Sequence, residues 1–379
     1  MPFHRRVAAA VVAAGAISTA GFMAAPGAQA QPASPIPYLS HFHHLRTIAS
    51  TVPANGDVNP YGVFVVRQST GRLHAGDVLV SNFNNKMNQQ GTGRTIVQIS
   101  PGGHRSLFAR IRNSAVAGRC PGGVGLTTAL EVLPGGWVVV GSTPSANGMA
   151  ATAKAGCLIV LNRFGRVAET FRGHGINGPW DSALAVGRGR IADLFVDNVL
   201  NGTVAAGGKV VNQGTVLRLT LLLRRHAAPR LVSTTKIGSG FPQQTNAAAF
   251  VLGTTGLGLG RHGTLYVAET DTSVISAIPH ALTRPGSAGT GTMVTSGGKL
   301  NAPLGLAIAP NGDVLTVNGN DGRIVETTPA GVQVASKYLD STPPKPLGAG
   351  ALFGLAVKYG HGGGVYYVDD ISNTLRLLH

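Results

Sequence analysis

The sequence predicts an all-β fold built from six repeated units. A Gly-rich turn followed by a short run of β-branched or aromatic residues occurs six times, at intervals of roughly 50 to 70 residues. Glycine makes up 54 of the 379 residues and charged residues only 12%, which favours tight turns over helical surfaces. The runs lie at residues 77–80, 137–140, 193–196, 264–267, 313–317 and 365–368. Each interval has room for about four short strands, so we predict a six-bladed β-propeller of four-stranded antiparallel blades.

The first thirty residues have the pattern of a secretory signal peptide. Arg5 and Arg6 precede an apolar stretch from residue 7 to about residue 25, and residues 28–30 form a small-x-small cleavage site. A retained membrane helix is the weaker interpretation because no stop-transfer pattern follows. We therefore expect residues 1–30 to be removed, leaving a protein without a transmembrane anchor in the periplasm or outside the cell.

The chain ends predict how the ring closes. Residues 31–44 are expected to be a flexible leader, in which His41, His43 and His44 could bind a transition metal adventitiously. The last unit stops after its third strand at residues 374–378, while residues 45–52 form an unassigned strand before the first unit. This N-terminal strand would complete the last blade and remove an exposed sheet edge. The propeller domain is thus expected to span residues 45–379.

Each strand position within a unit has its own composition. First strands are small and apolar, as in residues 305–309 and 354–357, because innermost strands converge on the central channel. Asn311-Gly312 is a hairpin turn between first and second strands. Third strands are apolar, as in residues 156–161, whereas fourth strands such as residues 332–337 are polar outer edges.

Residues 301–317 contain Pro, then Gly-Leu-Ala, a turn and a strand, and residues 353–357 with 365–369 repeat this order more loosely. These segments resemble the NHL-repeat six-bladed propellers, within the superfamily of SMP-30/gluconolactonases and strictosidine synthases. The resemblance covers residues 45–379 at the level of architecture. Because such propellers include both enzymes and binding modules, it does not assign a function.

Chain direction predicts a loop-rich face. In an antiparallel blade the start of the first strand and the link from the second to the third strand lie at the same end. These links are long in the first three units, at residues 82–93, 142–156 and 198–214. Long loops on a rigid scaffold commonly carry binding residues, so we expect the ligand site there.

Cys120 and Cys157 are the only cysteines, and both fall at this end of the second unit. Export permits a disulfide, so we predict a bridge between them. Two free thiols or a metal-binding pair are the alternatives.

Polar residues at the starts of first strands suggest a metal at the channel mouth. Asn59, Asp181, Asn246 and Asn301 could offer a hard cation such as Ca²⁺ one carboxylate and several amide oxygens. The set is similar to that of the gluconolactonases, although Asn177 stands where that family has Glu. His174 could act as a general base with Asp181. Alternatively, these Asn and Asp side chains cap turns and His174 is solvated. Glu131 is the only acid within a first strand.

The formal charge is +16, and removal of Arg5 and Arg6 with the signal peptide leaves +14. Such a surface attracts anionic polymers and lipids, but the favoured interpretation is that Arg and Lys solvate an otherwise uncharged exported surface. The arginine clusters lack interleaved aromatic residues, so nucleic acid is disfavoured as a partner. No serine-hydrolase elbow, zinc helix or phosphate loop is found.

We therefore predict an exported monomer that binds a small molecule, a glycan or an envelope protein at the loop-rich face. The alternative is a divalent-metal-dependent hydrolase or lyase, resembling the lactonases, at the channel mouth.

Overall fold

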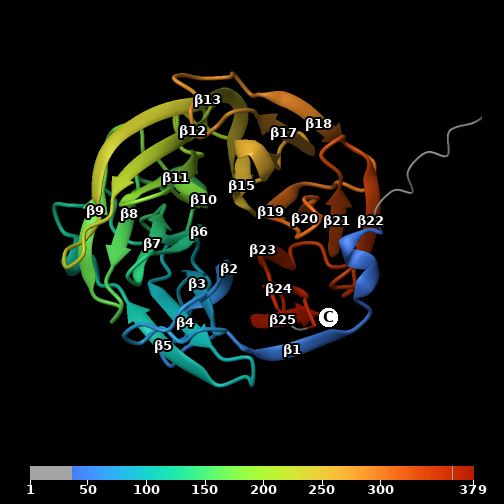
Figure 1. The fold of residues 1–379 in the computed structure, drawn as a ribbon, viewed down its shortest axis with the longest axis horizontal. Coiled ribbons are helices and arrows are strands. Elements are labelled where there is room, and N and C mark those ends of the chain that lie inside the picture. The colour runs from blue at the N-terminus through green and yellow to red at the C-terminus, as the bar shows by residue number, and fades with distance from the viewer. Residues whose placement is uncertain (1–35, 361) are drawn as a thin grey trace, which may run out of the picture. The chain divides into compact units, whose positions relative to one another are not determined.

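The computed structural model describes residues 36–379 except residue 361, so the predicted signal peptide lies outside the described residues. The described residues form six antiparallel sheets arranged in a ring (Figure 1), which confirms the predicted six-bladed propeller. Blades 1 to 3 comprise β2(Val58–Val65), β3(Val78–Asn84), β4(Thr95–Ile99), β5(Arg105–Arg110); β6(Leu126–Leu133), β7(Trp137–Ser142), β8(Cys157–Leu161), β9(Val167–Phe171); and β10(Pro179–Val186), β11(Ile191–Asn198), β12(Val211–Leu222), β13(Arg230–Asn246), β14(Phe250–Leu252). Blades 4 to 6 comprise β15(Thr254–Leu259), β16(Leu265–Glu269), β17(Val274–Ile278), β18(Thr292–Ser296); β19(Pro303–Ile308), β20(Val314–Asn318), β21(Arg323–Thr327), β22(Gln333–Tyr338); and β23(Leu352–Val357), β24(Val365–Asp369), β25(Thr374–Leu378), β1(Leu45–Ser50).

The first strand of each blade lies innermost, and glycine allows these strands to approach one another. A Cβ atom added at Gly354 would lie 1.9 Å from the Tyr61 carbonyl oxygen, and one added at Gly305 would lie 2.3 Å from that of Phe353. Both distances are impossible for a side-chain carbon, so the ring could not close at this radius with larger residues.

Hydroxyl groups join neighbouring blades near the channel. Thr127 Oγ1 and Thr143 Oγ1 in blade 2 donate hydrogen bonds of 2.9 and 3.1 Å to the Pro179 carbonyl oxygen in blade 3. Thr255 and Thr270 in blade 4 donate in the same way to Pro303 in blade 5. Apolar side chains fill the space between the sheets of blades 1 to 3, so blades 2 and 3 are joined both by packing and by polar bonds.

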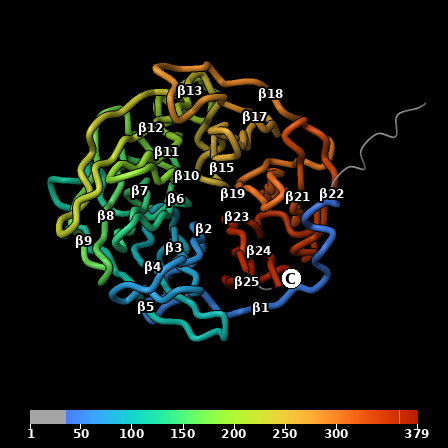
Figure 2. The backbone as a smooth tube through the Cα atoms, viewed as in Figure 1, coloured from blue at the N-terminus to red at the C-terminus, as the bar shows by residue number. Residues whose placement is uncertain are grey.

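The two ends of the chain meet in the last blade, as predicted. β1 pairs with β25 from Leu45 opposite Leu378 to Ser50 opposite Thr374, and the two run side by side in Figure 2. The backbone N–H groups of His43 and His44 both donate to the His379 carbonyl oxygen. The outer edge of β25 is therefore covered by β1.

Part of the predicted flexible leader packs against the propeller. A short 3-10 helix, η1(Tyr38–His41), places the fully buried Leu39 in the cluster between blades 5 and 6. The backbone N–H groups of Tyr38 and Leu39 donate to the carboxylate of Glu326, at 2.6 and 2.8 Å. This buried acid holds residues 38 and 39 because it accepts donors that the free end of the 3-10 helix leaves unpaired.

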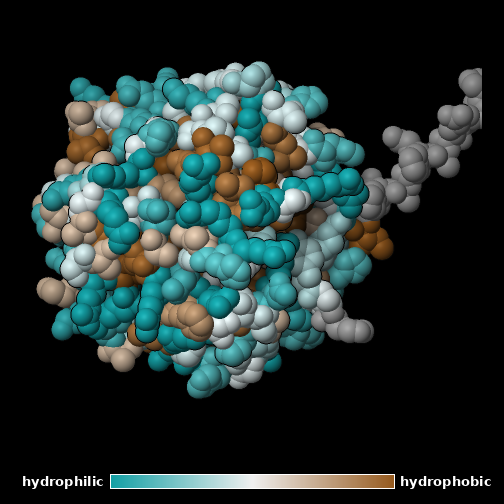
Figure 3. Space-filling view, turned by 60° about the vertical axis from the view of Figure 1, so that its left-hand side comes forward, coloured by the Kyte–Doolittle hydropathy of each residue, from teal (hydrophilic) through white to brown (hydrophobic). Residues whose placement is uncertain are grey.

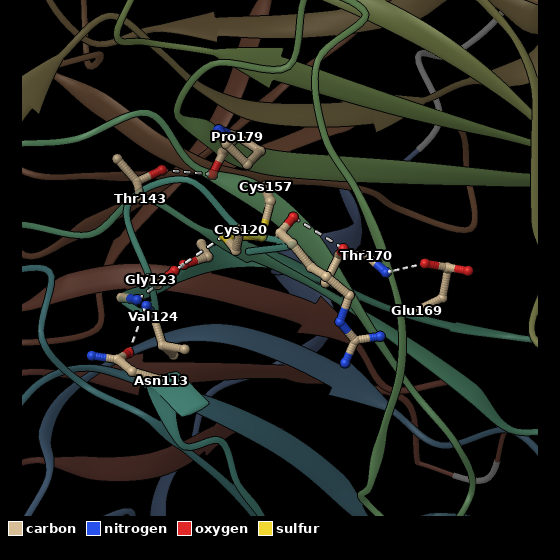
Figure 4. The surroundings of a disulfide bond; sticks show 12 residues. Asn113, Cys120, Gly123, Val124, Thr143, Cys157, Glu169, Thr170 and Pro179 are labelled. Atoms are coloured by element: carbon tan, nitrogen blue, oxygen red, sulfur yellow. Dashed lines mark hydrogen bonds between the residues drawn. A yellow bond between two sulfur atoms is a disulfide. The ribbon is translucent and has the colours of Figure 1, made fainter. Parts of the chain in front are cut away.

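Cys120 and Cys157 form the predicted disulfide, so the free-thiol and metal-pair alternatives are wrong (Figure 4). Cys157 begins β8, and Cys120 follows η2(Asn113–Val116). Nearby, the Val124 N–H donates to Asn113 Oδ1 at 3.1 Å, which fixes the chain between the cysteine and the first strand of the blade.

Blade 3 departs from the regular pattern. β12 and β13 have 12 and 17 residues, and β13 folds back into a fifth strand, β14. The predicted loop 198–214 is therefore partly strand, because β12 begins at Val211. The other short helices are η3(Ala150–Thr152) and η4(Arg261–Gly263). Among residues 36–379, residue 361 aside, no helix has the length and apolarity to cross a membrane.

Candidate functional site: a channel cavity

The two ends of the channel differ. Val58, at the start of β2, lies opposite Asn84 at the end of β3, and Leu126 lies opposite Ser142 in the same way. The long links 85–94 and 143–156 consequently lie where the first strands begin, as predicted. We call this end the loop-rich face, and the end where the first strands finish the cavity face.

Aromatic residues close the channel at the loop-rich face. Tyr61 stacks on Phe83 and Phe353, with ring centroids 4.6 and 4.3 Å apart, and Phe250 lies 6.2 Å from Trp180. Four of these five side chains are buried, and Phe353 is half-buried. We call these five residues the aromatic plug. No polar ligand could enter the channel through it without displacing large apolar groups.

The long loops lie over this plug and are bonded to one another. Gln90 Nε2 in the blade 1 loop donates to the Ala248 carbonyl oxygen in the β13–β14 hairpin at 2.8 Å. The Ser145 N–H in the blade 2 loop donates to the Gly91 carbonyl oxygen at 2.9 Å. The predicted wall of loops is thus a cap over the channel rather than the rim of an open mouth.

A cavity of about 1070 Å³ occupies the other half of the channel. It is lined by the later residues of all six first strands, including the apolar Leu130, Leu257, Leu306 and Leu355. Its outermost lining residues are exposed and belong to links that follow first strands, for example Tyr359. The cavity therefore opens at the cavity face, and its size is in the range of small-molecule sites.

Two carboxyl groups line this cavity, Glu131 from β6 and Asp181 from β10. Asp181 is buried, and its Oδ2 accepts the N–H of Leu257 in the next blade at 2.8 Å. Burial raises the pKa of Asp181 to about 7, although the N–H groups of Leu257 and Ser182 partly oppose this.

Glu131 is half-buried by area but lies deep in the ring, with protein on most sides. Burial, and to a lesser degree the negative charge of Asp181, raises its pKa to about 8 against the opposing charge of Arg67. At neutral pH Glu131 is therefore mainly protonated and can donate a hydrogen bond. Asp181 is a mixture of both forms.

Asp197 positions Asp181. Asp197 Oδ1 accepts the N–H groups of Asp181 and Trp180, at 2.7 and 3.3 Å. Asp197 itself is fully buried, and burial together with the Asp181 charge raises its pKa well above the usual value. The start of β10 is thus held by a side chain from its own blade.

Arg67 and Tyr359 lie at the mouth of the cavity. Both line it and both are exposed, and the Arg67 guanidinium lies 5.6 Å from the centre of the Tyr359 ring. This pair places a cation and an aromatic face where a ligand would enter.

The structure does not bring the predicted metal ligands together. Of the four, only Asp181 lines the cavity. Asn59 Nδ2 donates to Asp370 Oδ2 at 2.7 Å, and Asn301 Nδ2 donates to Asp321 Oδ2 at 3.2 Å. The Asn59 amide is thus engaged with blade 6 and the Asn301 amide within blade 5.

Asn246 does not precede a first strand as predicted, because it ends β13 and the hairpin to β14 follows. Its Oδ1 accepts the N–H groups of Ala248 and Ala249, at 2.8 and 2.9 Å, which is the turn-capping role that the sequence left open. His174 is exposed between two glycines and is not among the cavity residues. Within residues 36–379, residue 361 excluded, no three His, Cys, Asp or Glu side chains form a group able to hold a metal.

The sequence reasoning missed the importance of Glu131. The position of Glu131 in the sequence indicated an unusual residue, since an acid within an otherwise apolar first strand must face either the channel or the space between sheets. No pattern in the sequence indicated which half of the channel holds the cavity, because this depends on which half the aromatic rings fill.

No family model matches the chain, and no curated protein matches it. Among solved structures it is similar to a protein proposed to be a gluconolactonase (15% identity, 88% of this chain and 91% of that chain, TM-score 0.53). It is also similar to a gluconolactonase from Xanthomonas campestris (13% identity, 88% of each chain, TM-score 0.51). A third is the PQQ-bound aldose sugar dehydrogenase from Streptomyces coelicolor (15% identity, 88% and 97%, TM-score 0.52). At these identities the likeness concerns the fold, and it confirms the six-bladed architecture that the resemblance implies.

Proposed function

We propose that this chain is an exported binding protein that holds a small molecule in the channel cavity, entered from the cavity face. The observation that carries the proposal is a large cavity lined by both aliphatic and polar groups, with two carboxyl groups, Glu131 and Asp181, on its wall. Convergent polar groups in an otherwise apolar pocket are typical of ligand sites. The proposal keeps the predicted function and moves the site from the loop-rich face to the opposite end of the channel.

The lining indicates the chemistry of the ligand. Leucine, isoleucine and valine side chains from several blades offer an apolar surface to the body of the molecule. A protonated Glu131 would donate a hydrogen bond to a carbonyl or hydroxyl oxygen at the inner end. Arg67 would meet a negative or polar group at the mouth. We therefore expect an amphipathic molecule with an oxygen-bearing inner end.

A hydrolase or lyase is the second candidate, and the same two carboxyl groups favour it. Burial raises the pKa of Glu131 to about 8 and that of Asp181 to about 7, which would suit a general acid and a general base at neutral pH. Substrates with a lactone or ester carbonyl would present the required oxygen to Glu131.

Titration with a neutral apolar dye such as Nile red tests the binding site. We expect saturable binding at one site, and a loss of at least about tenfold in affinity when Ala307→Trp or Ala356→Trp fills the cavity. The matched control is Ala205→Trp, an exposed position in a loop of the loop-rich face. Equal weakening by the control, or binding without saturation, would contradict the proposal.

Turnover separates the two candidates. A panel of lactones and esters is incubated with the wild-type protein and with the Glu131→Gln and Asp181→Asn variants. Hydrolysis that both variants abolish, with dye binding retained, supports the enzyme. Dye binding without turnover of any panel member supports the binding protein.

A further inference from the structure

The acidic residues of this protein are less exposed to solvent than its basic residues. All 15 of them lie within the described residues, and every one is buried or half-buried, whereas most lysines and arginines are exposed. Within the described part of the chain, the ion pairs closer than 4 Å join Arg376 to Asp340 and Asp369. The formal charge of +14 that remains without Arg5 and Arg6 is therefore displayed outward with little internal compensation in the described residues.

Arginines are concentrated on the cavity face. They stand in the links from first to second strands and from third to fourth strands, which all reach this end of the ring. The members of this arginine rim are Arg67, Arg72, Arg163, Arg166, Arg188, Arg190, Arg224, Arg225, Arg261 and Arg284. The acids in or beside these links, Asp77, Asp193 and Asp313, are half-buried, so the exposed charged residues of the links are basic.

Large apolar side chains are exposed among these arginines. Phe164 is 47% exposed, Val186 54% and Tyr359 59%. The Arg163 guanidinium lies 5.4 Å from the centre of the Phe164 ring, and Arg67 lies over Tyr359 as described above. Figure 3, turned by 60° from the view of Figure 1, shows hydrophobic residues in patches between hydrophilic ones on the molecular surface. The cavity face thus carries exposed cations and exposed apolar side chains, of which Arg67, Val186 and Tyr359 line the cavity itself.

We propose that the cavity face docks on an anionic lipid bilayer, with the cavity mouth against the lipid headgroups. Arginines attract acidic headgroups, and their stems can lie along the apolar layer while their charges stay in water. Exposed Phe164, Val186 and Tyr359 lose their contact with water by entering the interface. An acidic polymer would satisfy the arginines but would leave these side chains in water, so a bilayer is the better match. Docking in this orientation would also let the proposed ligand move between the lipid and the cavity, and this last step alone depends on the proposed function.

Vesicle co-sedimentation of the full mature chain tests the proposal. The vesicles contain phosphatidylcholine alone or phosphatidylcholine with phosphatidylglycerol. We expect binding only to the anionic vesicles, weakened by salt. The Arg163→Gln, Arg188→Gln and Arg190→Gln triple variant should lower the partition coefficient by roughly 100-fold, since each basic residue near the surface adds about fivefold.

The opposite face supplies a control with the same change of charge. Lys86, Lys154 and Lys209 are exposed, one in each long loop, and the triple change to Gln should have less than about a fivefold effect. An equal loss in both triple variants would overturn the proposal, because net charge would then explain the binding. Circular dichroism and thermal unfolding of each variant verify that it is folded.

A second pair of variants tests the apolar contacts. Phe164→Ser with Val186→Ser should weaken vesicle binding about tenfold. An unchanged affinity in this variant, or binding to soluble polyphosphate that matches binding to vesicles, would assign the face to an acidic polymer and overturn the proposal. Dye binding to the cavity is measured on the same protein variants without vesicles. A failure of lipid docking is thereby distinguished from a failure of the cavity site.

Discussion

Glu131 shows how one residue can set the chemistry of the channel. It lies within β6, where neighbouring residues are apolar, and it has no basic partner within ion-pairing distance in the described structure. Burial and the nearby Asp181 both raise its pKa, and Arg67 at the mouth opposes them only in part. A carboxyl group kept in this environment costs stability when it is charged, which is typical of functional rather than structural acids.

The Glu131→Gln variant should be more stable than the wild type at high pH. In the folded protein burial raises the pKa of Glu131 to about 8, so the folded state binds the proton more tightly than the unfolded state. Its contribution to stability is present below the ordinary pKa and is lost as the pH rises toward 8. We expect the variant to gain on the order of 2 kcal/mol at pH 8 and almost nothing at pH 5, measured by urea unfolding.

Asp340→Asn is the matched comparison, because the pKa of Asp340 is lowered whereas that of Glu131 is raised. Burial acts to raise the pKa of Asp340, but hydrogen bonds from Thr342 and the charge of Arg376 lower it overall. Its contribution is present above the ordinary pKa and is lost as the pH falls. Asp340→Asn should therefore lose stability at neutral pH, and a gain at pH 8 in both variants would show that loss of any buried carboxylate stabilises the protein, whatever its pKa.

At the scale of the elements, the blades were predictable and the plug was not. The turn-and-strand cadence repeats locally, so residues 313–317 or 365–368 identify their strands without knowledge of the rest of the chain. The aromatic plug joins residues from β2, β3, β10, β14 and β23, which come together only when the ring closes. No local pattern distinguishes Phe250 in the hairpin from an aromatic residue in a sheet.

The sequence could not place the polar candidates for a related reason. Asn59, Asn246 and Asn301 have the residue types that bind cations, but the same types cap turns and strand ends. Which role an amide takes depends on the partner it meets, such as Asp370 beside Asn59, and that partner comes from another blade. The Cys120–Cys157 pairing was accessible because both residues belong to one blade, whose strand directions the sequence does predict.

The disulfide should stabilise blade 2 strongly. Cys120 and Cys157 are 37 residues apart in sequence and close a loop that contains β6 and β7. Replacement of both cysteines by serine should lower the free energy of unfolding by about 3 to 4 kcal/mol, mainly because the unfolded chain gains freedom. The measurement is urea unfolding of the double variant against the oxidised wild type. Reduced wild-type protein is the control, and it should unfold like the variant.

For the propeller as a whole, closure by β1 links the two ends of the chain to the stability of every blade. Each sheet packs on its two neighbours through clusters such as that of Leu39, Phe42 and Leu352. Loss of the outer strand of blade 6 would expose the edge of β25, and the loss of Leu39 would open a gap beside blade 5. The cost would therefore extend beyond the hydrogen bonds of a single strand pair.

Removal of residues 1–50 tests this closure against removal of residues 1–35, which retains η1 and β1. We expect the longer deletion to lower the free energy of unfolding by on the order of 5 kcal/mol, because it removes a strand, a buried leucine and the partners of Glu326. It should also associate with itself at high concentration, since the unpaired edge of β25 offers free N–H and carbonyl groups to another chain. Urea unfolding and size-exclusion chromatography of the two proteins make the comparison. If the longer deletion remained monomeric and as stable as the shorter one, the ring would be closed by blade packing alone and β1 would not be required.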